Sequence, residues 1–431
     1  MSPPAYTDRH AHLSAMRNAA AAGADAGQAV ARVLRRSRDR LDVGGRRFML
    51  TRSSRVFVIG LGKAAPAMCR AAASVLGKRL TAGVAAVPRA TTAPPPPRMT
   101  YIPSGHPYPD EGSLAAAQAA AELLAGAHSD DLVLALISGG GSAMFELPVA
   151  GVTLEDLRAL NRLLLESGAP IVAVNSVRRR FSQVKGGGLA RLASPASTIG
   201  LILSDVGGGG ISAVGSGPSV LAHGSPARDR LVLRQAGLWS QLPSWVRLAW
   251  NRPFEGRGCP RPHNVVVADN RTLVHAAAAQ ARALGFHVRT LSLSMHGEAR
   301  QVGEGIARRL RRAGPSECLL MGGETTVAVR GRGRGGRNQE LALSAAIALA
   351  GQGGVALMAY ASDGVDGPTD AAGARVDGET VEATARAAAD ARAALAHNDA
   401  YPILDSAGAL IRCGPTGTNL ADLVVGLRYA A

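Results

Sequence analysis

The stretch Gly322–Leu343, GGETTVAVRGRGRGGRNQELAL, organises the chain. It begins with a Gly-Gly turn after the apolar run Cys318–Met321 and places Glu324 ahead of a predicted short strand, Val327–Val329. A loop of alternating glycine and arginine follows and ends at Arg337, at the head of a helical run. Glycine lets the backbone approach a ligand closely, and a helix N-terminus favours anions because its first N–H groups lack partners. The stretch therefore predicts a phosphate site.

A competing interpretation of the same loop is a solvated basic hairpin or an RGG-like tail that binds nucleic acid. The loop lies between a predicted strand and an amphipathic helix, however, and a carboxylate and two hydroxyl groups precede it. This position favours a phosphate site over a tail.

The composition is that of a globular protein. The 431 residues predict two domains with sizeable cores, and 47% of them are hydrophobic. The formal charge of +16 permits contacts with nucleic acid or anionic membranes, but only 3% of the residues are aromatic and the basic residues are spread along the chain. Arginine-rich loops that bind small phosphorylated ligands explain the charge equally well, so we expect neither a nucleic-acid nor a membrane partner.

The cysteines and the terminal segments predict a reduced, cytoplasmic protein. Cys69, Cys259, Cys318 and Cys413 are far apart, and this spacing predicts neither a disulfide framework nor a zinc site. The N-terminus has no signal pattern, and glycines break the longest uncharged run, 341–362.

Strands and helices alternate along the chain. An Ala-rich helix is predicted over 8–37, and buried strands are predicted at Val56–Ile59, Leu132–Ile137 and Thr198–Leu203. The alternation predicts an α/β fold with a larger, doubly wound, mainly parallel sheet in the N-terminal domain. A smaller α/β domain is expected to follow.

The domain junction is predicted where periodicity is lost, at 240–262. This gives a Rossmann-like N-terminal domain over 1–245 and a C-terminal α/β domain over 260–431. In the second domain a helix is predicted over 378–396, and the loop 413–419 is expected to complete the unit.

The first glycine-rich turn is Gly60-Leu61-Gly62-Lys63-Ala64-Ala65, which fits the weak dinucleotide pattern G-x-G-x-x-A. NAD binding expects an acidic residue about 20 positions later, but no acidic residue occurs between Asp42 and Asp110. NADP held by an arginine stays open. Lys63 follows the turn at a helix N-terminus, where a cation is misplaced unless an anion is bound, so Lys63 is a candidate functional residue.

A second glycine-rich loop, Ser138–Ser142, follows a predicted buried strand. Ligands of open α/β sheets bind at the carboxyl ends of strands, and consecutive glycine N–H groups can form an anion-binding nest. Gly139, Gly140, Gly141 and Ser142 are therefore candidate binding residues. The alternative is a tight turn that serves packing alone.

Three further segments carry candidate polar groups. Lys185 beside three glycines is a candidate phosphate contact, whereas Arg179 and Arg180 fit a solvated helix. Asp205 follows a predicted strand and supplies the carboxylate oxygen that Mg²⁺ prefers. His106 fits a ligand contact and a structural histidine equally well.

The loop 362–370 contains three carboxylates, more than a turn needs, although Asp-Gly pairs often mark simple turns. Its spacing does not fit an EF-hand. The glycine-rich segment 414–419 adds hydroxyl groups near the C-terminus.

The stretch Gly322–Leu343 closely resembles the signature of the bacterial and eukaryotic glycerate 2-kinases, the family that carries the MOFRL domain. Similar segments occur along most of the chain: ISGGGSA at 137–143, NSVR at 175–178, KGGGLA at 185–190, LSDV at 203–206, SDGVDGPTDAAGA at 362–374 and GPTGTN at 414–419. The resemblance implies a MOFRL region over 315–427 and a site in the cleft between the two domains. It also implies ATP-dependent phosphorylation of D-glycerate to 2-phosphoglycerate with Mg²⁺, by a monomer or a homodimer.

The resemblance and the chemistry of the residues together assign the site. Lys63 and Arg337 are expected to carry the transition-state charge on one phosphate chain, and Asp205 to bind the metal or orient the hydroxyl. Each alanine substitution of the two cations should lower kcat by roughly 10²–10³ with little effect on folding. The expected substrate- or nucleotide-binding residues are Gly139, Gly140, Gly141, Ser142, Asn175, Lys185, Glu324, Asn338, Asp363, Asp366, Thr416 and Asn419.

One departure from the family keeps two alternatives open. Relatives usually carry one or two acidic residues shortly after the aspartate that matches Asp205, but this chain has four glycines at 207–210. A non-catalytic or altered-substrate relative is therefore one alternative. An NADPH-linked hydroxypyruvate reductase that uses the Gly60 turn is the other.

Overall fold

The computed structural model describes residues 3–206, 210–221, 225–251, 258–383 and 388–430, and the chain divides into two compact units. The first unit is 26–267, and the second combines 1–25 with 268–431. This division differs from the predicted boundaries at both ends, because the N-terminal helix belongs to the second unit and the strand at 263–268 belongs to the first.

The first unit contains a six-stranded sheet in the order β6-β5-β4-β7-β8-β9. Its strands are β4 (Val56–Leu61), β5 (Leu80–Pro88), β6 (Met99–Ser104), β7 (Leu132–Ile137), β8 (Ser197–Leu203) and β9 (His263–Ala268). The pairs from β6 to β8 are parallel, and every residue of β4 and β7 is buried. Strands buried on both faces are apolar throughout, as expected for a parallel sheet covered by helices. The predicted mainly parallel α/β sheet is confirmed.

Strand order places the switch point of this sheet between β4 and β7. The chain runs outward from β4 to β5 and β6, then returns to pair β7 on the other side of β4. Ligands of open α/β sheets bind outside the carboxyl ends of the strands at such a point. The turn from β4 into α3 (Ala65–Leu76) and the loop from β7 into α5 (Gly141–Met144) both begin there.

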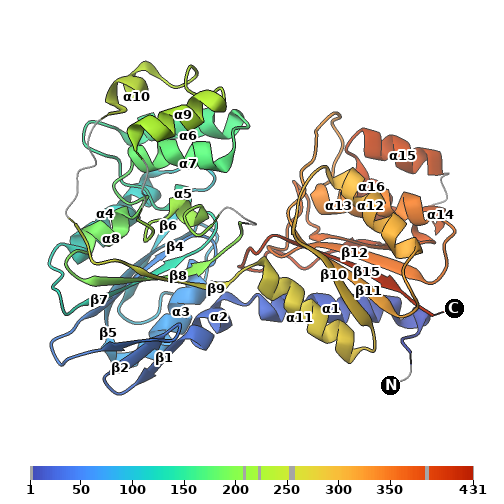
Figure 1. Ribbon diagram of the computed structural model, residues 1–431, viewed down its shortest axis with the longest axis horizontal. Coiled ribbons are helices and arrows are strands. Elements are labelled where there is room, and N and C mark those ends of the chain that lie inside the picture. The colour runs from blue at the N-terminus through green and yellow to red at the C-terminus, as the bar shows by residue number, and fades with distance from the viewer. Residues whose placement is uncertain (1–2, 207–209, 222–224, 252–257, 384–387, 431) are drawn as a thin grey trace. The chain divides into compact units, whose positions relative to one another are not determined.

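The remaining helices of this unit form two groups. α2 (Ala26–Val33), α4 (Glu111–Leu124) and α8 (Gly188–Leu192) accompany the sheet. α6 (Leu154–Glu166), α7 (Ile171–Arg180), α9 (Pro226–Gln235) and α10 (Ser244–Ala249) form a separate helical lobe, seen in green in Figure 1. A core of Leu, Val, Ala, Phe181 and Trp250 stabilises the lobe.

The predicted helix over 8–37 is interrupted. The structure has α1 (Arg9–Gly23), α2 and then strand β1 (Leu34–Ser37). β1 pairs antiparallel with β2 (Arg40–Val43), which pairs with β3 (Arg46–Met49). The tight turn between β1 and β2 favours a strand over continuation of the helix.

The second unit contains a mixed six-stranded sheet in the order β10-β11-β15-β12-β13-β14. Its strands are β10 (His287–Met295), β11 (Glu317–Gly323), β12 (Val355–Ala361), β13 (Gly373–Asp377), β14 (Leu410–Ile411) and β15 (Asp422–Arg428). Figure 1 shows α1 and α11 (Asn270–Ala283) on one face, and α12 (Ala299–Arg311) and α13 (Arg337–Leu349) on the other. α1 packs so closely on α11 that a Cβ on Gly23 would lie 2.7 Å from the Cβ of Ala276.

Two predicted elements of this unit need correction. Val327–Val329 forms no strand, and the preceding residue, Thr326, makes only an isolated bridge with Glu298. Within the helix predicted over 378–396 the structure describes α14 (Thr380–Ala383) and α15 (Ala388–Ala396), and 384–387 lie outside the described residues. The loop at 413–419 does not complete the unit, because β15 follows it and lies at the centre of the sheet. No helix among the described residues is long and apolar enough to cross a membrane.

Candidate active site

The two glycine-rich loops of the first unit bind each other at the switch point. The backbone N–H of Lys63 donates to the carbonyl of Gly139 at 2.9 Å, and Ala64 N–H donates to Ser138 Oγ at 3.1 Å. Gly62 has φ +105°, and a Cβ there would lie 2.5 Å from the Ser138 carbonyl oxygen. The close approach of the two loops therefore requires glycine at position 62.

Lys63, His106 and Asp205 lie around the Gly139–Gly140 backbone. A Cβ on Gly140 would lie 3.3 Å from Lys63 Cγ and 3.2 Å from His106 Cδ2. A Cβ on Gly139 would lie 2.1 Å from Asp205 Oδ2. The structure thus brings together predicted site residues from three separate strand ends. It also places His106 beside them, a residue for which the sequence left open whether it contacts a ligand or is structural.

The charges around this loop are mainly positive. The side chain of His106 is largely exposed, but partial burial of its ring, followed by the charges of Lys63 and Arg178, lowers its pKa. Burial also lowers the pKa of the Arg178 guanidinium, with Glu146 as the opposing charge. Burial and the two cations thus favour the neutral form of His106, and the positive charges around it suit an anionic ligand.

Ser142 and Asn175, both predicted binding residues, are joined through a third residue. Ser216 Oγ donates to Asn175 Oδ1 at 2.8 Å and lies 2.8 Å from Ser142 Oγ. Gly141 lies beneath them, where a Cβ would approach Leu61 Cδ1 to 2.7 Å. These bonds hold the glycine loop against helix α7.

Lys185 has a different environment from the one predicted. Its ammonium group forms an ion pair with Glu146, and both side chains are fully buried. Burial lowers the pKa of Lys185, and the Glu146 carboxylate opposes this effect. A phosphate contact would require Lys185 to leave its buried partner, so the geometry does not support Lys185 as a phosphate ligand.

In the second unit, the N-terminus of α13 binds a carboxylate of the protein itself. Asp366 accepts hydrogen bonds from the backbone N–H of Asn338 at 3.0 Å and of Gln339 at 2.9 Å. Its side chain is buried, and a Cβ on Gly336 would lie 2.4 Å from its carboxyl carbon. This helix end therefore does bind an anionic group, the carboxylate of Asp366, and a phosphate site beside it stays a prediction.

Replacing Asp366 with asparagine is expected to destabilise the protein by roughly 1–2 kcal/mol. The amide keeps one acceptor oxygen, but it loses the negative charge that favours the helix N-terminus and places an NH₂ group against N–H donors. Urea denaturation measures the difference. An Asp363→Asn variant is the matched control, and an equal loss in both variants would contradict the special role of Asp366.

Arg337 is held by two carboxylates of its own unit. Its Nε and Nη2 donate to Asp422 at 2.6 and 2.9 Å, and its Nη1 lies 3.0 Å from Glu324 Oε1. Burial raises the pKa of Asp422 to about 6 while Arg337 opposes the rise, and the carboxylates raise the pKa of Arg337 against the effect of its own burial. This geometry argues against the expectation that Arg337 matters little for folding.

The Gly-Arg loop is fixed by a distant segment. Asn398 Oδ1 accepts from the backbone N–H of Arg330 at 2.6 Å and of Gly331 at 2.9 Å. Asp399 Oδ1 accepts from Arg334 N–H at 2.8 Å. The loop is therefore an ordered part of the unit and differs from a solvated hairpin.

The loops that contain Asp363, Thr416 and Asn419 also bind each other. Thr416 N–H donates to the Asp363 carbonyl at 3.0 Å, and Thr416 Oγ1 donates to the Ser362 carbonyl at 2.6 Å. Asn419 Oδ1 accepts from Ala421 N–H at 3.1 Å. These contacts hold the loops in place, and ligand binding by the three residues stays a prediction.

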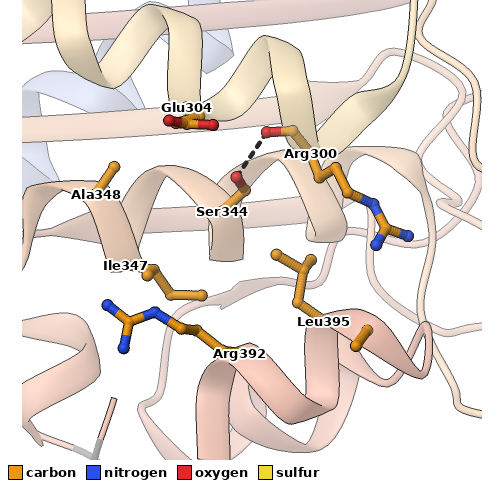
Figure 2. Close-up of a pocket in the computed structure, with 8 residues that line it drawn as sticks. Arg300, Glu304, Ser344, Ile347, Ala348, Arg392 and Leu395 are labelled. Carbon is orange, nitrogen blue, oxygen red and sulfur yellow. Dashed lines mark hydrogen bonds between the residues drawn. The ribbon is translucent and has the colours of Figure 1, made fainter. Parts of the chain in front are cut away.

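Figure 2 shows a cavity of about 400 Å³ in the second unit, lined by residues of α12, α13 and α15 and by none of the predicted site residues. Ser344 Oγ donates to the Arg300 carbonyl at 2.6 Å. The Arg300 guanidinium points away from Arg392 and pairs with Glu298, while Glu304 pairs with Arg308. Because Arg300 and Glu304 are already paired, the cavity is a weaker candidate for an anion site than the glycine loop.

The metal prediction rests on one carboxylate. Among the described residues, no group of three or more His, Cys, Asp or Glu side chains is arranged to hold a metal ion. Asp205 lies against Gly139, and the glycines at 207–209 lie outside the described residues.

The comparisons with known proteins cover both units. Residues 12–250 match a family model described as a domain of unknown function, DUF4147, and residues 317–422 match the MOFRL family. A glycerate 2-kinase of Pyrococcus horikoshii is 38% identical over 94% of both chains. A D-glycerate 2-kinase of Thermotoga maritima is 39% identical over 86% of this chain and 90% of its own.

Two further matches are a relative with a different name and a solved structure. One from Agrobacterium vitis, 38% identical over 86% of both chains, carries a provisional name as a hydroxypyruvate reductase. The crystal structure of a glycerate kinase from Thermotoga maritima matches with a TM-score of 0.84 and 35% identity, covering 96% of this chain and 97% of that one. With matches of this extent in sequence and fold, the chain belongs to the MOFRL-domain glycerate kinase family.

Proposed function

We propose that the protein transfers the terminal phosphoryl group of ATP to the 2-hydroxyl group of D-glycerate, giving 2-phosphoglycerate. The observation that carries the proposal is the position of Lys63 and Asp205 against the Gly139–Gly140 backbone at the switch point of the parallel sheet. Relatives named as glycerate 2-kinases support the choice of substrate.

The arrangement supplies what phosphoryl transfer requires. Catalysis of this reaction is mainly positioning and neutralisation of the charge on the transferring group. The Lys63 ammonium supplies a positive charge beside the glycine loop. The Asp205 carboxylate is an acceptor that can orient the attacking hydroxyl group.

Asp205 is also the residue that we propose for the magnesium ion. Mg²⁺ keeps several waters and is commonly bound by one or two carboxylates together with substrate phosphates, so a single carboxylate fits. Gly139 lets the glycine-loop backbone approach Asp205 so closely that any Cβ would overlap the carboxylate, which keeps loop and ligand oxygen together. When bound, the ion would neutralise charge on the phosphate oxygens.

Arg337 is proposed as a further charge for the phosphate chain. Asp422 and Glu324 occupy three of its five N–H groups, which leaves two for a ligand. Glu324 and Asn338 are proposed as its neighbours in ligand binding, on the resemblance stated above.

The reductase alternative is less well supported. The N–H groups of Lys63 and Ala64, at the turn where a dinucleotide pyrophosphate would bind, already donate to the loop at 138–139. The missing acidic residue argues against NAD alone and leaves the NADPH-linked alternative to be judged by these loop contacts.

A direct assay tests the reaction and its position. The protein is incubated with ATP, Mg²⁺ and D-glycerate, and enolase alone is used to convert the product to phosphoenolpyruvate. Enolase accepts 2-phosphoglycerate, so phosphoenolpyruvate is expected without addition of a mutase. ADP release that yields phosphoenolpyruvate only after mutase addition would identify the 3-phosphate instead. No ADP release at saturating substrate, or oxidation of NADPH by hydroxypyruvate in a parallel reaction, would overturn the proposal.

A further inference from the structure

Arg178 is a cation that the proposed chemistry has not yet used. Its Nε donates to Asn161 Oδ1 at 2.8 Å, and Asn161 Nδ2 in turn donates to the Leu157 carbonyl at 2.9 Å. The amide orientation is therefore fixed, with its oxygen toward Arg178. Among the described residues Arg178 forms no ion pair, and its two terminal NH₂ groups have no hydrogen-bond acceptor.

Helix α7 directs Arg178 toward the glycine loop. Asn175 lies three residues earlier, so the two side chains share one face of the helix. Asn175 is joined through Ser216 to Ser142 of the loop. The charge of Arg178 also acts on His106, whose ring lies over Gly140.

The surrounding charges leave an excess of positive charge. Lys63, Arg178 and Lys185 are cations near this loop, and Asp205 and Glu146 are anions near it. Lys185 pairs with Glu146, and the lowered pKa of His106 favours its uncharged form. In the part of the chain that the structure describes, Arg178 contacts no carboxylate.

We infer that Arg178 binds the carboxylate group of the acceptor substrate through its two terminal NH₂ groups; this rests on the proposed function. A planar guanidinium matches a carboxylate with two parallel hydrogen bonds. In a 2-hydroxy acid the reacting hydroxyl is on the carbon next to the carboxylate. Anchoring the carboxylate at Arg178 therefore fixes that hydroxyl relative to Lys63 and Asp205, which both lie against the Gly139–Gly140 backbone. The substrate class is a short 2-hydroxy carboxylate.

The test compares two acceptors in two enzymes. D-glycerate carries the carboxylate, and D-glyceramide carries the same hydroxyl groups on a neutral amide. We expect Arg178→Gln to lower kcat/KM for D-glycerate by roughly 10- to 100-fold, the loss of one hydrogen-bonded contact to a charged group. Most of the change should be in KM. The kcat/KM for D-glyceramide and the KM for ATP should be unchanged.

Two further variants control for charge and folding. Arg179→Gln removes the same charge from the next position of α7 and should keep the preference for D-glycerate. Arg178→Lys keeps the charge without the planar fork and should retain more of the preference than Arg178→Gln. Circular dichroism verifies that each variant is folded.

An equal loss with both acceptors, or a raised KM for ATP, would overturn the inference and place Arg178 in nucleotide binding or folding. Failure of the proposed function gives a different result, in which the wild-type protein phosphorylates neither acceptor. In that case calorimetric titration with D-glycerate decides. Weaker binding by Arg178→Gln than by wild type supports the inference, and equal binding overturns it.

Discussion

Replacing Arg337 with alanine is expected to lower the free energy of unfolding by about 3 kcal/mol, in addition to impairing catalysis. The substitution leaves Asp422 without its partner at a position where the carboxylate is 0% exposed. Breaking a buried ion pair costs roughly 3–5 kcal/mol, and the lower end applies because Arg337 keeps part of its surface in contact with water. Urea denaturation of the two proteins measures the difference.

The destabilisation should depend on pH with a defined sign. Burial raises the pKa of Asp422 to about 6 in the wild-type protein, against roughly 3.9 for an unfolded chain. Arg337 opposes this rise, so its removal raises the folded pKa further. Above about pH 6 the variant must bury a charge that no longer has a partner, or take up a proton that the wild type does not need. The loss relative to wild type is therefore expected to be larger at pH 8 than at pH 5.

A second substitution separates stability from activity. Arg337→Ala combined with Asp422→Asn removes both charges and should recover part of the stability without recovering activity. Arg334→Ala is the matched control from the same loop, because Arg334 is half-exposed and should cost less than about 1 kcal/mol. Equal destabilisation of Arg337→Ala at pH 5 and pH 8 would show that Asp422 is not left as an unpaired charge.

The part of the site around Lys63 could be predicted from local sequence. Buried parallel strands are short apolar runs, and each of these runs ends at a glycine-rich turn or an acidic residue. The carboxyl ends of neighbouring parallel strands meet at one edge of the sheet. Loops that follow β4, β7 and β8 therefore had to lie close together, as the contacts among Gly62, Gly139 and Asp205 confirm.

The part around Arg337 could not be predicted in the same way. Asp366 caps α13 from 28 positions further along the chain, and Asn398 binds the Gly-Arg loop from 68 positions away. A local pattern shows Asp366 only as part of an Asp-Gly turn. β15 follows a loop and lies between β11 and β12, so its place depends on long-range pairing that periodicity does not reveal.

Replacing Lys63 with alanine is expected to lower kcat by roughly 10²–10³ with little change in the free energy of unfolding. The contact that joins this residue to Gly139 is made by its backbone N–H, which alanine keeps. The side chain extends over Gly140, beside the proposed phosphate position, so the variant loses a charge and keeps the turn. Steady-state kinetics with ATP and D-glycerate measure the rate.

Lys78→Ala is the matched control for Lys63→Ala. Lys78 is an exposed lysine of the same unit, and only its carbonyl, which alanine keeps, accepts a hydrogen bond from Arg98. The kcat of Lys78→Ala should equal that of the wild type. A normal kcat in Lys63→Ala, or an equal loss in Lys78→Ala, would remove Lys63 from the catalytic assignment.

A titration of His106 tests the position of Lys63 without any turnover. The charge of Lys63 lowers the pKa of His106, after the effect of partial burial and together with Arg178. Lys63→Ala is therefore expected to raise the pKa of His106, whereas Lys78→Ala should leave it unchanged. Proton NMR of the imidazole ring follows both. A reduced kcat with an unchanged His106 pKa would mean that Lys63 acts from elsewhere than the Gly140 backbone. A reduced kcat with a raised His106 pKa would place the lost charge beside the glycine loop, where the phosphoryl group is proposed to bind.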